Sequence, residues 1–210
     1  MSKKEVRHIA VAGNIGAGKT TLVNKLAQHF GWSPRFEAVE DNPYLEDFYA
    51  DMAAWAFPLQ IFFLNSRFNH VLDIQQEPGP IIQDRTIYED AYIFAKNLHK
   101  SGHLSTRDYE TYWGLFNSMS QMIQPPDLLI YLKASIGTLT SQIAKRDRFY
   151  ERSISIRYLE DLNQHYDEWI NNYKEGPLMV INADETDYVK RPEDLGQIIQ
   201  KIQGELYGLF

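Results

Sequence analysis

The sequence contains no cysteine among its 210 residues. This absence excludes disulfide bonds, a thiol nucleophile, and zinc or iron–sulfur sites with cysteine ligands. A histidine zinc site is not indicated either, because His99 and His103 stand four residues apart without the glutamate of an HExxH pattern. The Gly-x-Ser-x-Gly pattern of serine hydrolases is also missing. Covalent catalysis by a cysteine or an activated serine is therefore not predicted.

Positive charge is scarce as well. The 21 lysine and arginine residues are outnumbered by 28 aspartate and glutamate residues, and the formal net charge is −7 at pH 7. Such a chain lacks the broad basic surface that binds nucleic acid. It can still bind a phosphate group, for which a few cations and backbone N–H groups suffice. We therefore expect no nucleic-acid partner, while small phosphate-bearing ligands are not excluded.

Long hydrophobic runs are missing too. The longest apolar-rich stretch, residues 52–64, is interrupted by Pro58 and Gln60 and is too short to span a bilayer. The basic start of the chain is followed by an apolar part that is too short for a signal peptide. We expect a cytoplasmic protein without a membrane partner. Because no repeat or linker divides the chain, we expect residues 1–210 to form one domain.

Several short apolar runs have the character of buried strands. Each is aliphatic and bounded by glycine, proline or polar residues, as in a parallel sheet that is covered on both faces. A further strand is expected within residues 36–42. The four clear runs are His8–Gly13, 80–84, Leu128–Lys133 and Leu178–Asn182.

Helical patterns separate these runs. The strongest is an apolar stripe that advances by three or four residues from Ile156 to Tyr173. Other helices are expected after Lys19, over residues 44–74, over residues 107–124 and after Pro192. We interpret most aromatic residues as core. The alternation of strand and helix predicts an α/β fold with a parallel sheet flanked by helices.

Residues 13–20 carry the most specific motif. They read Gly-Asn-Ile-Gly-Ala-Gly-Lys-Thr and match G-x-x-x-x-G-K-[ST] between a predicted strand and a predicted helix. The glycines let backbone N–H groups converge on phosphates, Lys19 can bridge the β- and γ-phosphates, and Thr20 can ligate Mg²⁺. The motif predicts binding of a nucleoside triphosphate such as ATP. The residues assigned to this loop are Gly13, Asn14, Ile15, Gly16, Ala17, Gly18, Lys19, Thr20 and Thr21.

An acid and an arginine follow the predicted strand 80–84. Ligands of doubly wound sheets bind beyond the carboxyl ends of the strands. Asp84 can hold Mg²⁺ there, and Arg85 can clamp a transferring phosphoryl group. The alternative is a surface ion pair at a strand end.

Three acids after the first helix are candidates for activating a hydroxyl acceptor. Glu37, Glu40 and Asp41 each supply a carboxylate that could accept the proton of an attacking hydroxyl. Spacing does not choose among them, and a solvated acidic loop is the alternative.

A compact basic cluster lies at residues 145–152. Lys145, Arg146, Arg148 and Arg152 could form a lid over the triphosphate, or simply a solvated helix end. The NKxD signature of small GTPases is absent, which disfavours a GTPase switch.

Taken together, the motifs resemble those of the deoxynucleoside kinases, over about residues 9–173. The resemblance rests on the phosphate loop, Glu37-Ala38-Val39, the segment Asp84-Arg85-Thr86 with its continuation to Asp90, and the basic cluster. It implies a P-loop kinase fold with a short arginine-rich lid at about residues 145–155. It also implies transfer of a phosphoryl group from ATP to the 5′-hydroxyl of a deoxynucleoside. The stretch Asn42-Pro43-Tyr44 and the short lid are similar to the bacterial deoxyadenosine and deoxyguanosine branch, and deoxycytidine is a further candidate.

The resemblance also implies residue roles. Glu37 is the expected general base, and Lys19 and Arg85 act on the transferring phosphoryl group. The departures from the usual family pattern are Ala38, Thr86 and Gln142, the last removing one lid cation. Expected ATP contacts of the lid come from Arg146 and Arg148. At the sugar 3′-hydroxyl, the expected contacts are Tyr49 and Glu151. At the base, they are Gln60, Arg67 and Asp90, with Phe94 stacked on the ring. At the reacting hydroxyl, they are Glu37 and Arg85.

Two partners and two rival functions complete the expectations. The resemblance implies a homodimer formed through long helices, and feedback binding of a deoxynucleoside triphosphate. A nucleoside monophosphate kinase would share the fold and the phosphate loop but would need cations for its phosphate acceptor. A nucleotide-binding subunit without turnover would not need the set formed by Lys19, Glu37, Asp84 and Arg85.

Overall fold

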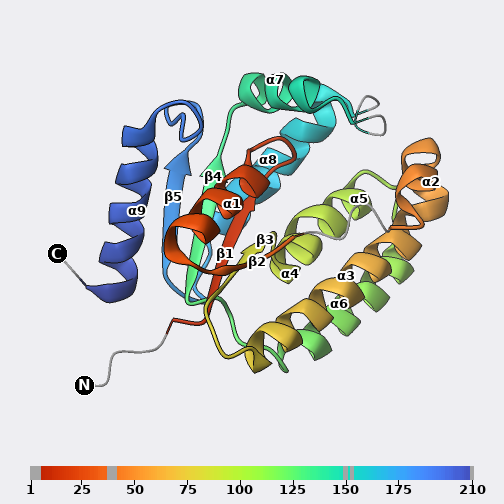
Figure 1. Ribbon diagram of the computed structural model, residues 1–210. Helices are drawn as coiled ribbons and strands as arrows, with labels where there is room; N and C mark the ends of the chain where they lie inside the picture. The colour runs from red at the N-terminus through yellow and green to blue at the C-terminus, as the bar shows by residue number, and fades with distance from the viewer. Residues whose placement is uncertain (1–5, 37–41, 149–150, 152–153, 209–210) are drawn as a thin grey trace.

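The computed structural model describes residues 6–36, 42–148, 151 and 154–208 (Figure 1). Its described strands form one five-stranded sheet in the order β2-β3-β1-β4-β5. Every neighbouring pair is parallel, as the short apolar runs predicted. The strands are β1 (His8–Gly13), β2 (Ser33–Arg35), β3 (Ile81–Asp84), β4 (Leu128–Lys133) and β5 (Leu178–Asn182).

The strand order reverses direction around β1. The chain first runs outward to β2 and returns to β3, which pairs with one side of β1, and then crosses to β4 on the other side. In the register, Val11 lies opposite Asp84 and Gly13 lies opposite Leu132. The carboxyl ends of β1 and β3 therefore meet at the point where open α/β sheets bind their ligands.

Each face of the sheet has its own hydrophobic core. Ile9 and Val11 of β1 face a core that includes α1 (Lys19–Phe30), α7 (Ile136–Arg146) and α9 (Pro192–Tyr207). Ala10 and Ala12 face the other core, because side chains alternate along a strand. Helices therefore flank the sheet on both faces, as the strand–helix alternation predicted.

The second face carries most of the helices. Figure 1 shows α3 and α6 lying side by side, with α2 beyond the end of α3. The stripe predicted from Ile156 onward is confirmed in α8, where Leu159, Leu162 and Tyr166 are buried. The described elements of this side are α2 (Leu45–Ala50), α3 (Met52–Gln76), α4 (Ile87–Glu89), the π-helix η1 (Asp90–Ala95), α5 (Lys96–Lys100), α6 (Thr106–Ser120) and α8 (Ile156–Asn171).

Three elements differ from the expectations or were not among them. Most of the strand expected within residues 36–42 lies outside the described residues, which exclude 37–41, and the second strand that the structure describes is earlier, at Ser33–Arg35. Its sequence lacks an apolar run because it is an edge strand, where Pro34 is tolerated. The helix expected over residues 44–74 is two helices, broken at Asp51, whose side chain accepts a hydrogen bond from the Ala54 amide and caps α3. The π-helix η1 had no counterpart among the expectations.

None of the helices in the described ranges is long and apolar enough to cross a membrane.

Candidate functional site

The loop between β1 and α1 has the conformation that its glycines predicted. Gly16 and Gly18 have φ angles of 84° and 96°. A Cβ atom at Gly16 would lie 2.7 Å from the carbonyl oxygen of Leu139, and one at Gly18 would lie 2.3 Å from the Tyr188 hydroxyl. Only glycine fits both the backbone angles and the space at these positions. These two glycines let the loop wrap around the N-terminus of α1, where the helix dipole and free N–H groups favour a phosphate group.

Lys19 lies folded over this loop. Its side chain is buried, and its Nζ donates hydrogen bonds to the carbonyl oxygens of Gly13 at 2.8 Å and Asn14 at 3.2 Å. The ammonium group is therefore placed beside the loop, in reach of the space that a phosphate chain would fill.

Thr20 and Asp84 meet at the carboxyl end of β3. The Thr20 hydroxyl donates a hydrogen bond to Asp84 Oδ2 at 2.5 Å. The other carboxylate oxygen, Oδ1, is buried and has no hydrogen-bond partner among the described residues. This pair fits Mg²⁺, which takes one or two protein oxygens and fills its other positions with water and phosphate oxygens. A larger cluster of acidic or histidine ligands is not found in the described part of the chain.

Arg85 is directed into the site by an uncommon backbone conformation. Its φ angle is 71°, which a residue with a side chain adopts only at a cost of about 1–3 kcal/mol. Its guanidinium lies 4.4 Å from the centre of the Phe94 ring, which belongs to η1. The arginine is buried at the junction of the phosphate loop and the π-helix.

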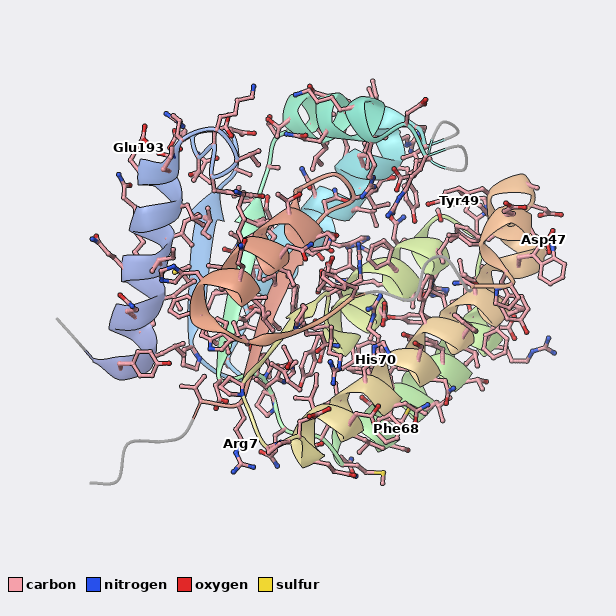
Figure 2. The ribbon with its side chains drawn as sticks, viewed as in Figure 1. Arg7, Asp47, Tyr49, Phe68, His70 and Glu193 are labelled. Atoms are coloured by element: carbon pink, nitrogen blue, oxygen red, sulfur yellow. The ribbon has the colours of Figure 1, made fainter. Side chains whose placement is uncertain are left out.

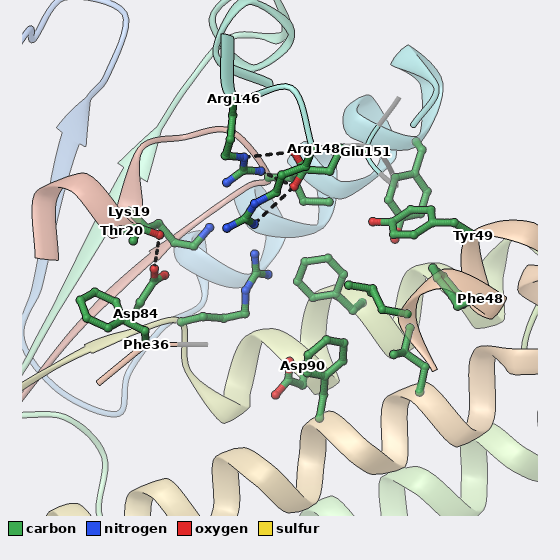
Figure 3. Close-up of a pocket in the computed structure, with 18 of the residues that line it drawn as sticks. Lys19, Thr20, Phe36, Phe48, Tyr49, Asp84, Asp90, Arg146, Arg148 and Glu151 are labelled. Atoms are coloured by element: carbon green, nitrogen blue, oxygen red, sulfur yellow. Dashed lines mark hydrogen bonds and ion pairs between the residues drawn. The ribbon is translucent and has the colours of Figure 1, made fainter. Parts of the chain in front are cut away.

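These groups line one side of a cavity of about 430 Å³ (Figure 3). Figure 3 places Lys19, Thr20 and Asp84 on one side, Tyr49 and Phe48 on the other, and Arg146 and Arg148 between them. The predicted residues that line it are Ile15, Gly16, Lys19, Thr20, Tyr49, Gln60, Asp84, Arg85, Asp90, Phe94, Arg146, Arg148 and Glu151.

Buried polar side chains lie at the end of the cavity away from the phosphate loop. Arg67 Nε and Asp90 Oδ2 are 2.5 Å apart, with only 2% and 3% of the two side chains exposed. Gln60 is also buried, and its Oε1 has no hydrogen-bond partner among the described residues. Gln60 and Arg67 thus face the interior of the protein, and the solvent-facing alternative for this side of α3 is wrong.

The basic cluster continues directly from α7. The helix ends at Arg146, and Asp147 has a φ angle of 48° that turns the chain back. Glu151, which is buried, accepts hydrogen bonds from Arg146 Nε at 3.1 Å and from Arg146 Nη2, and lies 3.7 Å from Arg148 Nη1. The carboxylate therefore holds both arginines at the cavity, and Figure 3 shows the three side chains together.

The remaining predicted residues lie around the cavity. Tyr49 lines it from α2, and Figure 2 shows Asp47 on the opposite, outer side of the same helix. Arg67 stands behind Asp90 without lining the cavity. Glu37, Glu40, Asp41 and Arg152 lie outside the described residues. The loop residues Gly13, Asn14, Ala17, Gly18 and Thr21 are not among those that line the cavity.

Several lining residues were not predicted. All are apolar or aromatic, and the aromatic ones came under the interpretation of most aromatic residues as core. The available signal for Phe63 was its spacing with Gln60 and Arg67, at i, i+3 and i+7 on one helix face. Burial raises the pKa of the Tyr158 phenol, so that Tyr158 remains neutral and can serve as a hydrogen-bond donor. The unpredicted residues are Phe36, Leu45, Phe48, Leu59, Phe63 and Tyr158.

Comparison with known proteins gives kinases of deoxynucleosides both by sequence and by structure. The family model described as deoxynucleoside kinase matches residues 9–206. A deoxyadenosine/deoxycytidine kinase of Bacillus subtilis is 36% identical over 201 residues, covering 95% of this chain and 93% of the relative. A deoxyadenosine kinase of Dictyostelium discoideum is 42% identical over 196 residues, covering 93% and 79%.

The solved structures agree. Deoxyadenosine kinase from M. mycoides with bound dATP has a TM-score of 0.83 and 31% identity, covering 94% of this chain and 99% of that one. The same kinase with the products dCMP and dCDP has a TM-score of 0.84 and 32% identity, again covering 94% and 99%. Both comparisons therefore extend over the sheet, the phosphate loop and the helices that line the cavity.

Proposed function

This chain belongs to the deoxynucleoside kinase family and is an enzyme that phosphorylates the 5′-hydroxyl of deoxynucleosides with ATP, and we propose that its preferred acceptors are deoxyadenosine and deoxyguanosine. The observation that carries the reaction is one cavity that extends from the phosphate loop to Asp90 of the buried Arg67–Asp90 pair, and the purine preference is supported by the relatives described as deoxyadenosine kinases. A phosphoryl donor at one end and a nucleoside at the other would meet within it.

At the phosphate end, we assign charge stabilisation to Lys19, Arg85, Arg146 and Arg148. Phosphoryl transfer involves little covalent chemistry by the protein, so that catalysis depends on positioning and on cations around the transferring group. Lys19 and Arg85 approach from the loop and the end of β3, and the two arginines approach from the end of α7. We propose that residues 145–155 act as a lid that brings these arginines onto the triphosphate.

Magnesium would be held by Thr20 and Asp84. When bound with ATP, the ion neutralises charge on the β- and γ-phosphates. Oδ1 of Asp84 supports this assignment, because it is buried, accepts no hydrogen bond from the residues that the structure describes, and can therefore ligate a cation.

Glu37 is proposed as the general base that accepts the proton of the 5′-hydroxyl. It directly follows Phe36, which lines the cavity, and this neighbour supports the role. Tyr49 and Glu151 are proposed to hold the sugar 3′-hydroxyl from α2 and from the segment after α7.

The base is proposed to lie between Phe94 and the polar side chains of Gln60 and Asp90. The amide of Gln60 can donate and accept at once, and the ion pair with Arg67 orients the Asp90 carboxylate. Arg67, Asp90 and Gln60 could bind either an adenine edge or a cytosine edge. Deoxycytidine is therefore a second candidate, favoured by the relative described as a deoxyadenosine/deoxycytidine kinase.

A substrate panel tests the proposal. We would measure kcat/KM for deoxyadenosine, deoxyguanosine, deoxycytidine and thymidine, using ADP release, with deoxyadenosine monophosphate as a control acceptor. We expect the two purine deoxynucleosides to be the best acceptors. A strong preference for thymidine would contradict the assignment of Arg67 and Asp90. Phosphorylation of the monophosphate alone would favour a monophosphate kinase.

We also propose a homodimer and inhibition by a deoxynucleoside triphosphate. The long helix α6 and the turn after it supply exposed apolar side chains, Leu115 at 38% and Met122 at 65% exposure. The M. mycoides kinase has been solved with dATP and with dCTP bound. Light scattering on the purified chain tests the dimer, and inhibition by dATP that is competitive with the deoxynucleoside tests feedback.

A further inference from the structure

A second cavity, of about 560 Å³, lies beside the first and has no part in the proposed reaction. It is lined by α5 and the turn after it, by the beginning of α8, and by Met52 at the beginning of α3. Tyr158 is the one described residue that lines both cavities. The phosphate loop and the side chains assigned to the nucleoside therefore do not line this second cavity.

The buried part of this cavity presents polar nitrogen atoms that lack protein partners. Only 2% of Asn97 and 3% of His165 is exposed, and both residues line the cavity. Asn97 Nδ2 and His165 Nδ1 have no hydrogen-bond partner among the described residues, and the nearest acid places its oxygen 3.6 Å from His165 Nδ1. A buried donor without a partner costs about 1–3 kcal/mol, so such a group is normally satisfied by water or by a ligand. The Asn97 amide nitrogen can only donate, and it therefore requires an acceptor in the cavity.

Two cations stand at the exposed rim of the cavity. Lys100 ends α5, and Arg157 lies in the first turn of α8. Neither forms an ion pair with another residue that the structure describes, whereas Lys96, one turn before Lys100, is paired with Glu168 at 2.8 Å. Burial, and then the positive charges of Lys100 and Lys96, lower the pKa of His165, so its ring stays neutral and adds no charge.

Helix stability does not account for Arg157. The first turn of a helix favours anionic side chains, because the helix dipole and the free N–H groups make this end positive. The first turn of α8 contains no acidic residue and contains this arginine instead. Arg157 and the N-terminus of α8 therefore add to one another in making this side of the cavity positive, in a chain whose net charge is −7.

The donors fit an anion that carries oxygen atoms on several sides. Lys100 and Arg157 come from different helices, and Asn97 lies deeper than either. A carboxylate presents two oxygens in one plane, whereas a phosphate group presents three around its phosphorus atom and can meet all three side chains. Asp161 also lines the cavity, and its carboxylate can accept a hydrogen bond from a hydroxyl group of an ester. The second cavity is larger than the first one of about 430 Å³, so that space remains for the organic part of such an ester.

We propose that the second cavity is a binding site for a phosphate group, either free or carried by a small ester. Lys100 and Arg157 bind its oxygens from the rim, and the amide of Asn97 donates from the floor. The site is separate from the phosphate loop, and the proposal does not depend on which deoxynucleoside is phosphorylated.

The experiment is a calorimetric titration of the full chain with inorganic phosphate. The first cavity is filled beforehand with a non-hydrolysable ATP analogue, Mg²⁺ and deoxyadenosine, because the phosphate loop would otherwise bind phosphate as well. We expect one phosphate ion to bind per chain. Lys100→Met and Arg157→Met should each weaken this binding by about tenfold, as the loss of a hydrogen bond between charged groups does. Both side chains are exposed, so we expect both variants to fold.

Lys201→Met is the matched control. It removes an exposed lysine of α9, which packs on the opposite face of the sheet, and phosphate binding should stay within about twofold of the wild type. Asn97→Asp keeps the size of the side chain but replaces the donor by a carboxylate, and it should prevent phosphate binding by repulsion. A cooperative unfolding transition checks that each variant is folded.

Two further ligands distinguish the chemistry. Tighter binding of 2-deoxyribose 5-phosphate than of inorganic phosphate would identify an ester as the ligand, and equal or weaker binding would identify free phosphate. Acetate that binds as tightly as phosphate would overturn the assignment to a phosphate group. The proposal would also be overturned if no phosphate bound to the filled enzyme, or if the variant lacking both Lys100 and Arg157 bound phosphate as tightly as the wild type.

Discussion

The two ends of the cavity are formed by residues from different kinds of structural element. At the phosphate end, most of the groups are backbone atoms and side chains that follow the carboxyl ends of β1 and β3, and only Arg146 and Arg148 come from elsewhere, at the end of α7. At the nucleoside end, they are side chains from α2, α3, η1 and the segment after α7, which are far apart along the chain. The first end depends on local conformation and the second on helix packing. Substitutions at the phosphate end should therefore affect turnover, and those at the nucleoside end should affect binding and stability together.

The largest effect is expected from Lys19→Ala. Removing the cation from the transferring phosphoryl group should lower kcat by about 10³–10⁵-fold, the range of comparable phosphate-end cations. The measurement is steady-state ADP release, with Lys25→Ala on the same helix as control. Nearly normal turnover of Lys19→Ala would show that the phosphate end does not work as described.

Glu37→Gln tests whether the acceptor is activated by this acid. We expect kcat to fall by ~10²–10⁴-fold while deoxynucleoside binding persists, because the amide cannot accept the proton. Glu40→Gln and Asp41→Asn are the matched controls, since both are carboxylates of the same segment. If either control variant loses the activity and Glu37→Gln keeps it, the base has been assigned to the wrong residue.

Arg67→Ala probes the nucleoside end. It leaves Asp90 as a buried charge without its ion-pair partner, which should lower the free energy of unfolding by about 3–5 kcal/mol and also raise the KM for the deoxynucleoside. Arg35→Ala is the contrast, because the Arg35–Glu77 pair is about one-third exposed and should contribute less than about 1 kcal/mol. Denaturant unfolding measures both. Equal stability losses would remove the distinction between the buried and the exposed pair.

The smallest effect is expected at His8, which begins β1 at the end of the strand away from the phosphate loop. Its Nε2 is hydrogen-bonded to Gln83 Oε1 at 2.8 Å, and burial lowers its pKa to about 4. His8 takes up a proton near pH 6.5 in the unfolded chain but only near pH 4 in the folded chain. Above pH 6.5 it is neutral in both states and does not change the free energy of unfolding. As the pH falls from 6.5 toward 4, protonation favours the unfolded chain, and the free energy of unfolding decreases. The cost should approach about 3 kcal/mol near pH 4.

Unfolding curves between pH 7 and pH 4 measure this loss. His8→Gln should flatten the pH dependence, while His29→Gln, at an exposed position of α1, should leave it unchanged. An identical slope in the His8 variant would assign the acid sensitivity to other groups.

The contrast between the two ends also explains which residues could be predicted. The phosphate loop, Thr20 and Asp84 were recognised because each follows or opens an element with a clear local pattern. The break at Asp51 and the edge strand Ser33–Arg35 were missed, since capping and edge pairing leave little trace in hydrophobic periodicity. The roles of Gln60, Arg67 and Phe94 came from resemblance, because a buried polar residue and a solvated one look alike along a helix.

The sequence by itself determined the parallel sheet, the helices of both faces and the glycine-rich loop between β1 and α1, because these depend on hydrophobic period and on glycine at particular backbone angles. Only the tertiary structure decided that Asp90 pairs with Arg67, that Arg85 stacks on Phe94, and that Glu89 and Tyr166 hold Gly13. Each of these contacts joins residues on different elements. Their geometry follows from how the helices pack, which no local pattern in the chain encodes.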